Sequence, residues 1–291
     1  MKTLWTYSAL VLATLYHGSL QCKPCQTPSL RSKLSLFFEF SKVTLDFHFY
    51  VSLLGPKILV VGGDATEMKT ELWPDSECTM PEVPLAFLFA VGFWTIQGPT
   101  VCGGIGGGKT CLIYKDHHHQ WLPWTDMGTS RYGASALQID PNHALIIGGA
   151  DENGYPLKTT ELISSTGTKK GIDFPVTIGH HCSFKINATH GLVTGGWQDG
   201  SRSRSTWFVD LTWTTPTVTP GPTMKTRRAY HGCSIFKHGT KTFGIVSGGG
   251  RGLYWTNATN VQLNSTEIID FDQESPKWTE GMQDKSKLLY R

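Results

Sequence analysis

Short apolar runs, each ending in two glycines, recur along the chain at nearly even spacing. One copy reads Ala144-Leu145-Ile146-Ile147-Gly148-Gly149. The run is too short for a helix and rich in Ile, which favours a buried strand. A Gly-Gly pair lets the backbone turn through positive φ or pass close to a neighbour. Five such pairs occur, at Gly62-Gly63, Gly103-Gly104, Gly148-Gly149, Gly195-Gly196 and Gly248-Gly249.

The spacing of these pairs indicates an internal repeat. Their first glycines, at positions 62, 103, 148, 195 and 248, lie 41, 45, 47 and 53 residues apart, which is typical of repeat architectures. After most pairs come a polar loop, a run such as Thr160-Glu161-Leu162, a position often held by Trp, and an Arg- or His-bearing strand such as Arg131-Tyr132-Gly133. Each unit therefore predicts four short antiparallel strands, whose sheet buries both faces only by packing against similar sheets.

This order of features resembles the kelch repeat of β-propellers over roughly residues 43–283. The resemblance implies an all-β fold, a kelch-type β-propeller with about five recognisable four-stranded blades. Kelch-like rings generally hold more than five blades, so we expect either an incomplete ring or an irregular closure. The departures are Cys78 where the first blade would carry Trp, Trp207 where the fourth would carry Glu, and the lack of Trp in the third.

The chain is expected to begin with a signal peptide at 1–20 and a leader at 21–42, followed by the propeller at 43–283 and a tail or further blade at 284–291. Alternation over Phe38–Val51 predicts the inner strand of the first blade. The apolar run Leu85–Ile96 is too short to cross a membrane and is expected to be a strand of the second blade. The later blades are expected at Leu85–Met127, Arg131–Phe174, Ile178–Val218 and Arg227–Met282.

The N-terminus indicates secretion. Lys2 precedes the apolar run Leu4–Tyr16, which is typical of a secretory signal, with an N-terminal strand or short anchor as the alternative. Glycosylation sequons at Asn187, Asn257 and Asn264 agree with an extracellular location and with no membrane span after signal cleavage. The net charge of +3 favours neither a nucleic acid nor a membrane surface as partner.

Seven cysteines in an oxidising compartment predict disulfides with one thiol left over. Cys102 and Cys111 end one strand and begin the next, so a hairpin could join them. Cys182 and Cys233 are assigned to equivalent positions of successive blades and are expected to be small buried residues rather than a bridge. The motif Cys22-Lys23-Pro24-Cys25 matches a redox pattern, but without a surrounding βαβ unit a loop-tying disulfide is expected.

Two local patterns suggest ligands that their context disfavours. Residues 103–110 match a phosphate-binding loop, but the strand-like Cys111-Leu112-Ile113-Tyr114 follows where that mechanism needs a helix. Consecutive residues of an extended segment point to opposite faces, so His117-His118-His119 is interpreted as a solvated loop rather than a metal site. We expect no cofactor and no metal.

An enzyme remains the alternative to a binding protein, because galactose oxidase, a copper radical oxidase, shares the kelch-type propeller. Such a site needs paired His, two Tyr and a Cys near one Tyr. Tyr230, His231 and Cys233 are adjacent in sequence, but no full ligand set can be matched. A converging His, Tyr and Cys set at the axis would favour a secreted carbohydrate-active enzyme, and an axis lined by Gly, Ala and Ser would favour a scaffold.

The loops between second and third strands and those between blades should open on one face, because strands alternate in direction. Arg suits capture of carboxylate or sulfate, and kelch propellers commonly bind proteins on this face. We therefore expect a non-catalytic scaffold for an extracellular protein or an acidic glycan. The alternative is that Arg131 and Arg228 are structural parts of the repeat. Glycans at Asn257 or Asn264 would move an interface toward the third and fourth blades. The candidate ligand-binding residues are Arg131, Lys158, Arg202, Arg204, Lys225, Arg227, Arg228 and Arg251.

Overall fold

The computed structural model of the chain describes residues 50–54, 57–61, 68–73, 80–212, 217–251 and 261–281. In these segments the regular structure is β-strand, apart from one 3₁₀ helix, η1 (Asp116–His118). The signal peptide, leader and C-terminal tail expected from the sequence lie outside the described residues. So does the strand expected over Phe38–Val51, except for Tyr50 and Val51, which begin β1.

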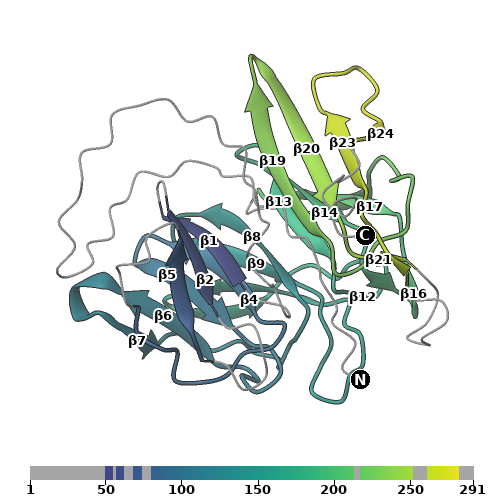
Figure 1. Cartoon of the computed structure of the whole chain (residues 1–291). Coiled ribbons are helices and arrows are strands. Elements are labelled where there is room, and N and C mark those ends of the chain that lie inside the picture. Colours follow the sequence, from purple (N-terminus) through teal and green to yellow (C-terminus); the bar gives the residue numbers. More distant parts are fainter. Residues whose placement is uncertain are drawn as a thin grey trace, which may run out of the picture.

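The strands form five successive antiparallel meanders (Figure 1). The first sheet contains β1 (Tyr50–Leu54), β2 (Lys57–Val61) and β3 (Thr70–Trp73). The second contains β4 (Val91–Thr95), β5 (Gly98–Cys102), β6 (Cys111–Lys115) and β7 (Gln120–Pro123). The third contains β8 (Ser135–Asp140), β9 (His143–Ile147), β10 (Thr160–Ser164) and β11 (Gly167–Lys170).

The fourth sheet contains β13 (Cys182–Lys185), β14 (His190–Thr194), β17 (Thr206–Asp210) and β18 (Val218–Pro220). The fifth contains β19 (Gly232–His238), β20 (Lys241–Ser247), β23 (Thr266–Asp270) and β24 (Trp278–Glu280). Short strands in the loops are β12 (Ile178–Gly179), β15 (Trp197–Gln198), β16 (Ser201–Arg202), β21 (Gly250–Arg251) and β22 (Val261–Gln262). The predicted four-stranded units are thus confirmed for the second to fifth sheets, and the first shows three strands in its described part.

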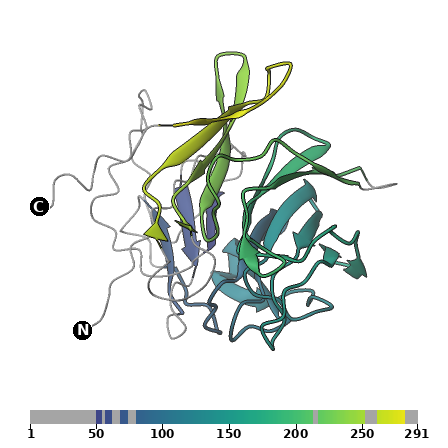
Figure 2. The ribbon, with the colours of Figure 1, turned by 90° about the vertical axis from the view of Figure 1, so that its right-hand side faces the viewer.

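The first strand of each sheet forms the inner edge of the assembly. β1 packs beside β4, β4 beside β8, β8 beside β13, and β13 beside β19. Figure 2 shows the fourth and fifth sheets, green and yellow, side by side. The described residues therefore establish a series of blade-like sheets, although they do not trace a closed ring.

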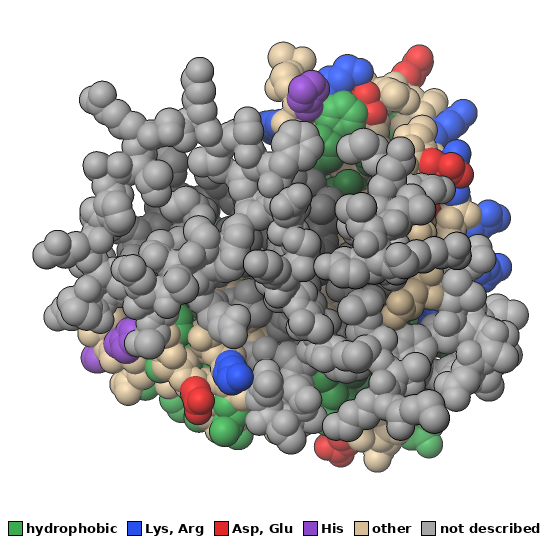
Figure 3. All heavy atoms as spheres, in the orientation of Figure 1, with side chains coloured by type: hydrophobic (Ala, Val, Ile, Leu, Met, Phe, Trp, Pro, Cys, Tyr) green, Lys and Arg blue, Asp and Glu red, His purple; other side chains and the backbone are tan. Residues whose placement is uncertain are grey.

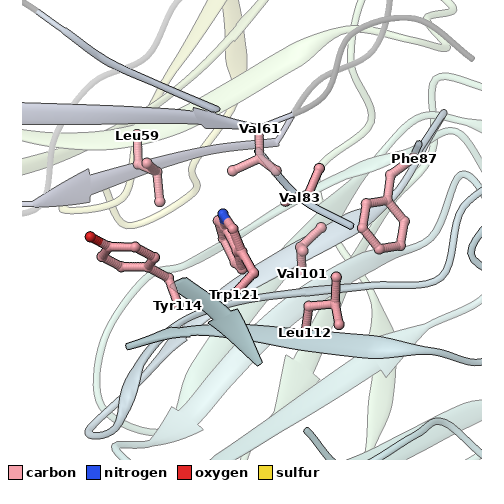
Figure 4. Packing of buried hydrophobic residues seen from close by; sticks show 8 residues of the cluster. All are labelled: Leu59, Val61, Val83, Phe87, Val101, Leu112, Tyr114 and Trp121. Atoms are coloured by element: carbon pink, nitrogen blue, oxygen red, sulfur yellow. The ribbon is translucent and has the colours of Figure 1, made fainter. Parts of the chain in front are cut away.

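The hydrophobic core lies between successive sheets, so a sheet that lies between two others is buried on both faces. Adjacent residues of one strand face opposite clusters, as period-two side-chain geometry requires. Val101 packs between the first and second sheets, whereas Cys102 packs between the second and third. Figure 4 shows the first of these clusters, in which Leu59 and Val61 face Trp121 of β7. This burial explains why the strands are continuous apolar runs rather than alternating ones.

The four described diglycine pairs, from Gly103-Gly104 to Gly248-Gly249, have positive φ at every residue. Gly148 shows why a side chain is excluded there: a Cβ would lie 2.1 Å from the carbonyl oxygen of Ile178. Gly62-Gly63 lie outside the described residues. Trp121 and Trp278 occupy fourth strands as predicted, while Trp213 is not described.

Candidate functional site

The loops expected to share one face are joined by backbone hydrogen bonds. The N–H of Gly104 donates to the carbonyl oxygen of Arg131 at 2.8 Å, and the N–H of Gly149 donates to that of Ile178 at 2.8 Å. The N–H of Gly196 donates to the carbonyl oxygen of Arg228 at 2.7 Å. Each diglycine loop thus contacts the connection that enters the next sheet. We call the side formed by these loops and connections the loop face.

Arg131 was a candidate ligand-binding residue, but the structure buries its side chain, which is only 1% exposed. Its Nε and Nη2 donate to Glu161 Oε1 at 3.0 and 2.9 Å. Its Nη1 donates to the carbonyl oxygens of Gly148 and Thr159. The second carboxylate oxygen of Glu161 accepts the N–H of Gly128 at 2.7 Å. Arg131 therefore joins two loops inside the protein, because its partner carboxylate lies there.

Arg228 repeats this arrangement in the fifth sheet and is 0% exposed. It donates to Glu267 Oε1, with the Nη2 contact at 3.1 Å, and to the carbonyl oxygens of Gly248 and Ser265. Burial lowers the pKa of the Arg228 guanidinium, and the charge of Glu267 partly offsets that effect. Both arginines are thus structural, as the alternative interpretation held, and neither is available to a ligand.

In the second and fourth sheets the same two positions carry apolar residues. Ile178 and Trp207 stand where the third sheet has Arg131 and Glu161, as their equivalent strand and loop pairings show. Ile178 is buried and Trp207 packs against the same cluster. The fourth sheet therefore has Trp207 in place of the expected Glu and Ile178 in place of the arginine with which that Glu would pair. The second sheet has Phe87 in one cluster with Leu112.

Arg202 is the third candidate that the structure places inside, at 0% exposure. It lies opposite Trp197 in the β15–β16 hairpin, with its guanidinium carbon 5.4 Å from the indole centroid. A guanidinium at this distance from an indole is attracted by the ring. The local polar sequence gave no sign of this partner, so the expectation of a surface role for Arg202 was wrong.

Four of the candidate cations are exposed on the loop face: Lys158, Arg204, Lys225 and Arg227. The side chain of Arg251 lies outside the described residues. Basic and acidic side chains are interspersed along the right-hand edge of the molecule in Figure 3. Surface charge alone therefore does not single out a site, and the position of each cation in the repeat matters more.

A collar of backbone hydrogen bonds links equivalent residues just before the first strands. The N–H of Gly133 donates to the carbonyl oxygen of Phe89 at 2.9 Å, and the N–H of His180 donates to the carbonyl oxygen of Gly133 at 2.6 Å. The N–H of Tyr230 donates in turn to the carbonyl oxygen of His180 at 2.9 Å. All four residues have φ between 51° and 64°. This left-handed conformation costs a non-glycine residue about 1–2 kcal/mol, and the collar bonds hold it in place.

The collar side chains form an aromatic cluster with Tyr132. The ring centroids of His180 and Tyr230 are 4.2 Å apart, and those of Phe89 and His180 are 4.8 Å apart. Tyr132 lies 5.9 Å from His180. A Cβ on Gly133 would lie 2.6 Å from the imidazole of His180, so this glycine makes room for the ring. The four half-buried rings lie at the end of the inner strands that opens on the loop face.

Among the described cysteines, Cys102 and Cys111 form the predicted hairpin disulfide. Cys182 and Cys233 also form a disulfide, which corrects the expectation that they do not bridge. In the fourth sheet Cys182 lies opposite Thr194, the residue just before the diglycine. In the fifth sheet the residue opposite the equivalent Ser247 is Gly232, and Cys233 comes one residue later. Because adjacent strand residues face opposite ways, this offset turns the two thiols toward each other.

The structure shows the local conformation of the two disfavoured ligand patterns. Residues 103–110 form a turn followed by strand β6, so no helix N-terminus is present to hold phosphate. His117 and His118 lie in the 3₁₀ helix η1 and His119 follows it, so the expectation of an extended segment is wrong. All three residues are exposed between β6 and β7, as expected for a solvated loop. Within the part of the chain that is described, no group of three or more His, Cys, Asp and Glu is arranged to hold a metal.

Part of the constellation that an oxidase would need does converge. Tyr132, His180 and Tyr230 meet in the aromatic cluster. Cys182 and Cys233 are both consumed by their disulfide, so neither offers a thiol to modify a tyrosine. The described cluster therefore lacks the Cys thiol beside a Tyr that the copper radical site considered from the sequence needs.

Two buried histidines lie beside the collar. His181 Nε2 is hydrogen-bonded to Ser135 Oγ at 2.7 Å, and His231 Nε2 to Thr194 Oγ1 at 2.9 Å. Burial lowers the pKa of each imidazole to about 3. For His231, the charge of Arg228 and the neighbouring His181 also contribute to this lowered pKa. Both rings are therefore neutral at physiological pH.

The sequons lie on different sides of the molecule. Asn264 is exposed two residues before β23, on the loop face, and Asn187 is exposed in the β13–β14 hairpin at the other end of the strands. Asn257 lies outside the described residues. No helix in the described segments is long and apolar enough to span a membrane.

Sequence reasoning missed Phe89, Tyr132 and His180. Phe, Gly, His and Tyr share no chemistry at the collar position, only a backbone conformation. The available signal for the collar position was its constant place two residues after Phe87, Arg131, Ile178 or Arg228, whereas Tyr132 directly follows Arg131.

No family model matches the chain, and no curated protein matches it. Among solved structures, one entitled "Structure of YjhT" superposes with a TM-score of 0.67 over 81% of this chain and 83% of that chain, at 10% sequence identity. At this identity the likeness shows a shared fold and nothing about activity. The predicted all-β fold of successive antiparallel sheets is thus confirmed.

Proposed function

We propose that the chain is a kelch-type β-propeller that acts outside the cell as a non-catalytic scaffold and binds a protein ligand through its loop face. The order of motifs in each repeat and the fold shared with YjhT support the propeller. Two disulfides, together with the signal-like N-terminus and the sequons, support an oxidising compartment.

The observation that carries this proposal is the aromatic cluster. Tyr, Trp, Phe and Arg are the residues that protein interfaces favour, with aromatic anchors near the centre and polar residues at the rim. Phe89, Tyr132, His180 and Tyr230 are half-buried and in mutual contact. The surrounding loops carry the exposed cations, which suit carboxylates of a partner. An acidic glycan is the second ligand class consistent with these cations.

The test removes a ring without disturbing the collar. Tyr230→Gly introduces the residue that the third sheet already has at this position, Gly133, and glycine adopts the left-handed conformation freely. We expect the thermal midpoint to change little, because relieved strain offsets lost ring contacts. Affinity for an extracellular protein selected from a secreted-protein panel should fall about thirtyfold, as for a central hot spot.

A matched control separates this site from general surface effects. The variant Lys169→Gln/Lys237→Gln/Lys277→Gln removes three exposed charges away from the loop face and should leave the affinity unchanged. Equal affinities of wild type and Tyr230→Gly, with both folded, would contradict the proposed face. Weakened binding in the control as well would point to nonspecific charge attraction.

A second candidate is a secreted carbohydrate-active enzyme on the same fold, because Tyr132, His180 and Tyr230 converge and supply the His and Tyr, though not the Cys, of the set described above. Incubation with a panel of oligosaccharides, followed by mass spectrometry of the products, tests it. Turnover that Tyr230→Gly abolishes would replace the scaffold with this enzyme.

A further inference from the structure

A basic residue occupies the same structural position in three successive sheets. Lys109, Lys158 and Arg204 each stand two residues before the third strand, at β6, β10 and β17. Their carbonyl oxygens accept equivalent bonds from the N–H groups of Met127, Phe174 and Met224, at 2.9, 2.7 and 2.9 Å. All three side chains are exposed. The repeat therefore places one cation per sheet along the loop face.

Two more cations adjoin the last of these. The connection into the fifth sheet carries exposed Lys225 and Arg227, and Arg227 Nη1 donates to the carbonyl oxygen of Arg202 at 3.1 Å. The sequence has no Asp or Glu between Asp210 and Glu267. Glu267 itself is buried against Arg228. The chain segment that carries Lys225 and Arg227 therefore supplies no exposed carboxylate of its own. The exposed carboxylate of the fourth sheet's loop, Asp199, accepts hydrogen bonds from the N–H and hydroxyl of Thr177.

Several carboxylates of the loop face are already engaged in local structure. Asp126 Oδ1 accepts the N–H of Cys111, and Asp151 Oδ1 accepts those of Asn153 and Tyr155. Asp173 pairs with Lys170 at 3.3 Å. Within the described residues no carboxylate forms an ion pair with Lys109, Lys158, Arg204 or Lys225, which leaves these cations available to an external anion.

We propose that Lys109, Lys158, Arg204, Lys225 and Arg227 form a track for a linear sulfated glycan. A polyanion with regularly spaced sulfates matches cations that the repeat sets one per sheet, and both Lys and Arg bind such groups with charge-assisted hydrogen bonds. The track is bounded, because the position before β3 holds Met68 and that before β23 holds Asn264. The track rests on the loop face of the proposed function and specifies its second ligand class, the acidic glycan, but it does not use the rings of the aromatic cluster.

The experiment measures affinity for heparin and for chemically desulfated heparin as a function of NaCl concentration. The variant Lys109→Gln/Lys158→Gln/Arg204→Gln should bind heparin about tenfold more weakly than wild type, since three exposed contacts are lost. Its affinity should also depend less on salt, because fewer counterions are exchanged. The control Lys169→Gln/Lys237→Gln/Lys277→Gln has the same net charge and should bind like wild type.

Equal weakening in the two triple variants would overturn the track, because it would show only general cation exchange. Equal affinity for desulfated heparin would also overturn it. An acidic peptide such as polyglutamate should not compete at equal charge concentration, and effective competition would assign the cations to a protein ligand instead. Tyr230→Gly should retain full heparin affinity, so that failure of this site and of the protein-binding face can be told apart.

Discussion

Mild acid should destabilise the protein through His181 and His231. Both imidazoles are buried and have a pKa of about 3, whereas histidine in an unfolded chain has a pKa near 6.5. Because the unfolded state binds these protons more readily, stability is complete above pH 6.5 and is lost as the pH falls toward 3. From pH 7.5 to 5.5 the two histidines together should lower the free energy of unfolding by about 3 kcal/mol.

The assay is urea denaturation followed by tryptophan fluorescence at both pH values, with the disulfides kept oxidised. The pH window lies above the range in which unfolded carboxylates titrate. The lowered pKa values of Asp210 and Asp270 therefore do not contribute to the expected change.

The matched variant is His181→Ala/His231→Ala, because the second and third sheets already have Ala90 and Ala134 at this position. In this double variant most of the difference in free energy of unfolding between the two pH values should disappear, and in each single variant about half of it should disappear. A wild type equally stable at pH 7.5 and 5.5 would refute the reasoning. So would a double variant that keeps the full drop.

Three further outcomes follow from the packing. Glu161→Leu should cost about 3–5 kcal/mol in urea denaturation because it leaves Arg131 buried and unpaired, and a loss under 1 kcal/mol would contradict that assignment. Adding Arg131→Phe, which recreates the apolar pair of the second sheet, should recover much of this loss, and no recovery would count against the proposed equivalence. Cys182→Ser/Cys233→Ser should cost about 4 kcal/mol of stability, whereas removing the Cys102–Cys111 disulfide should cost about 2.5 kcal/mol, because the Cys182–Cys233 disulfide closes the longer loop. The reverse order of the two costs would contradict this loop-length argument.

Features with local causes were predictable from the sequence. The diglycine strands and the Cys102–Cys111 hairpin follow from residues close together in the chain. The burial of Arg131 depends on Glu161, which lies 30 residues away, so charge alone suggested a surface residue. The Cys182–Cys233 bridge depends on an offset of one residue, which reverses the direction of a side chain.

The candidate site was harder to predict than the fold. Lys158, Arg204, Lys225 and Arg227 were expected on the loop face and are exposed there. The aromatic cluster was not expected, because Phe89, His180 and Tyr230 share only a left-handed backbone, which the sequence suggests only at the equivalent Gly133.

The central claim is that the aromatic cluster of the loop face binds an extracellular protein. The most direct measurement is the dissociation constant of wild type and Tyr230→Gly for one purified ligand, by surface plasmon resonance, with thermal midpoints recorded on the same samples. We predict a loss of about thirtyfold at an unchanged midpoint. Equal dissociation constants for two equally stable proteins would contradict the account.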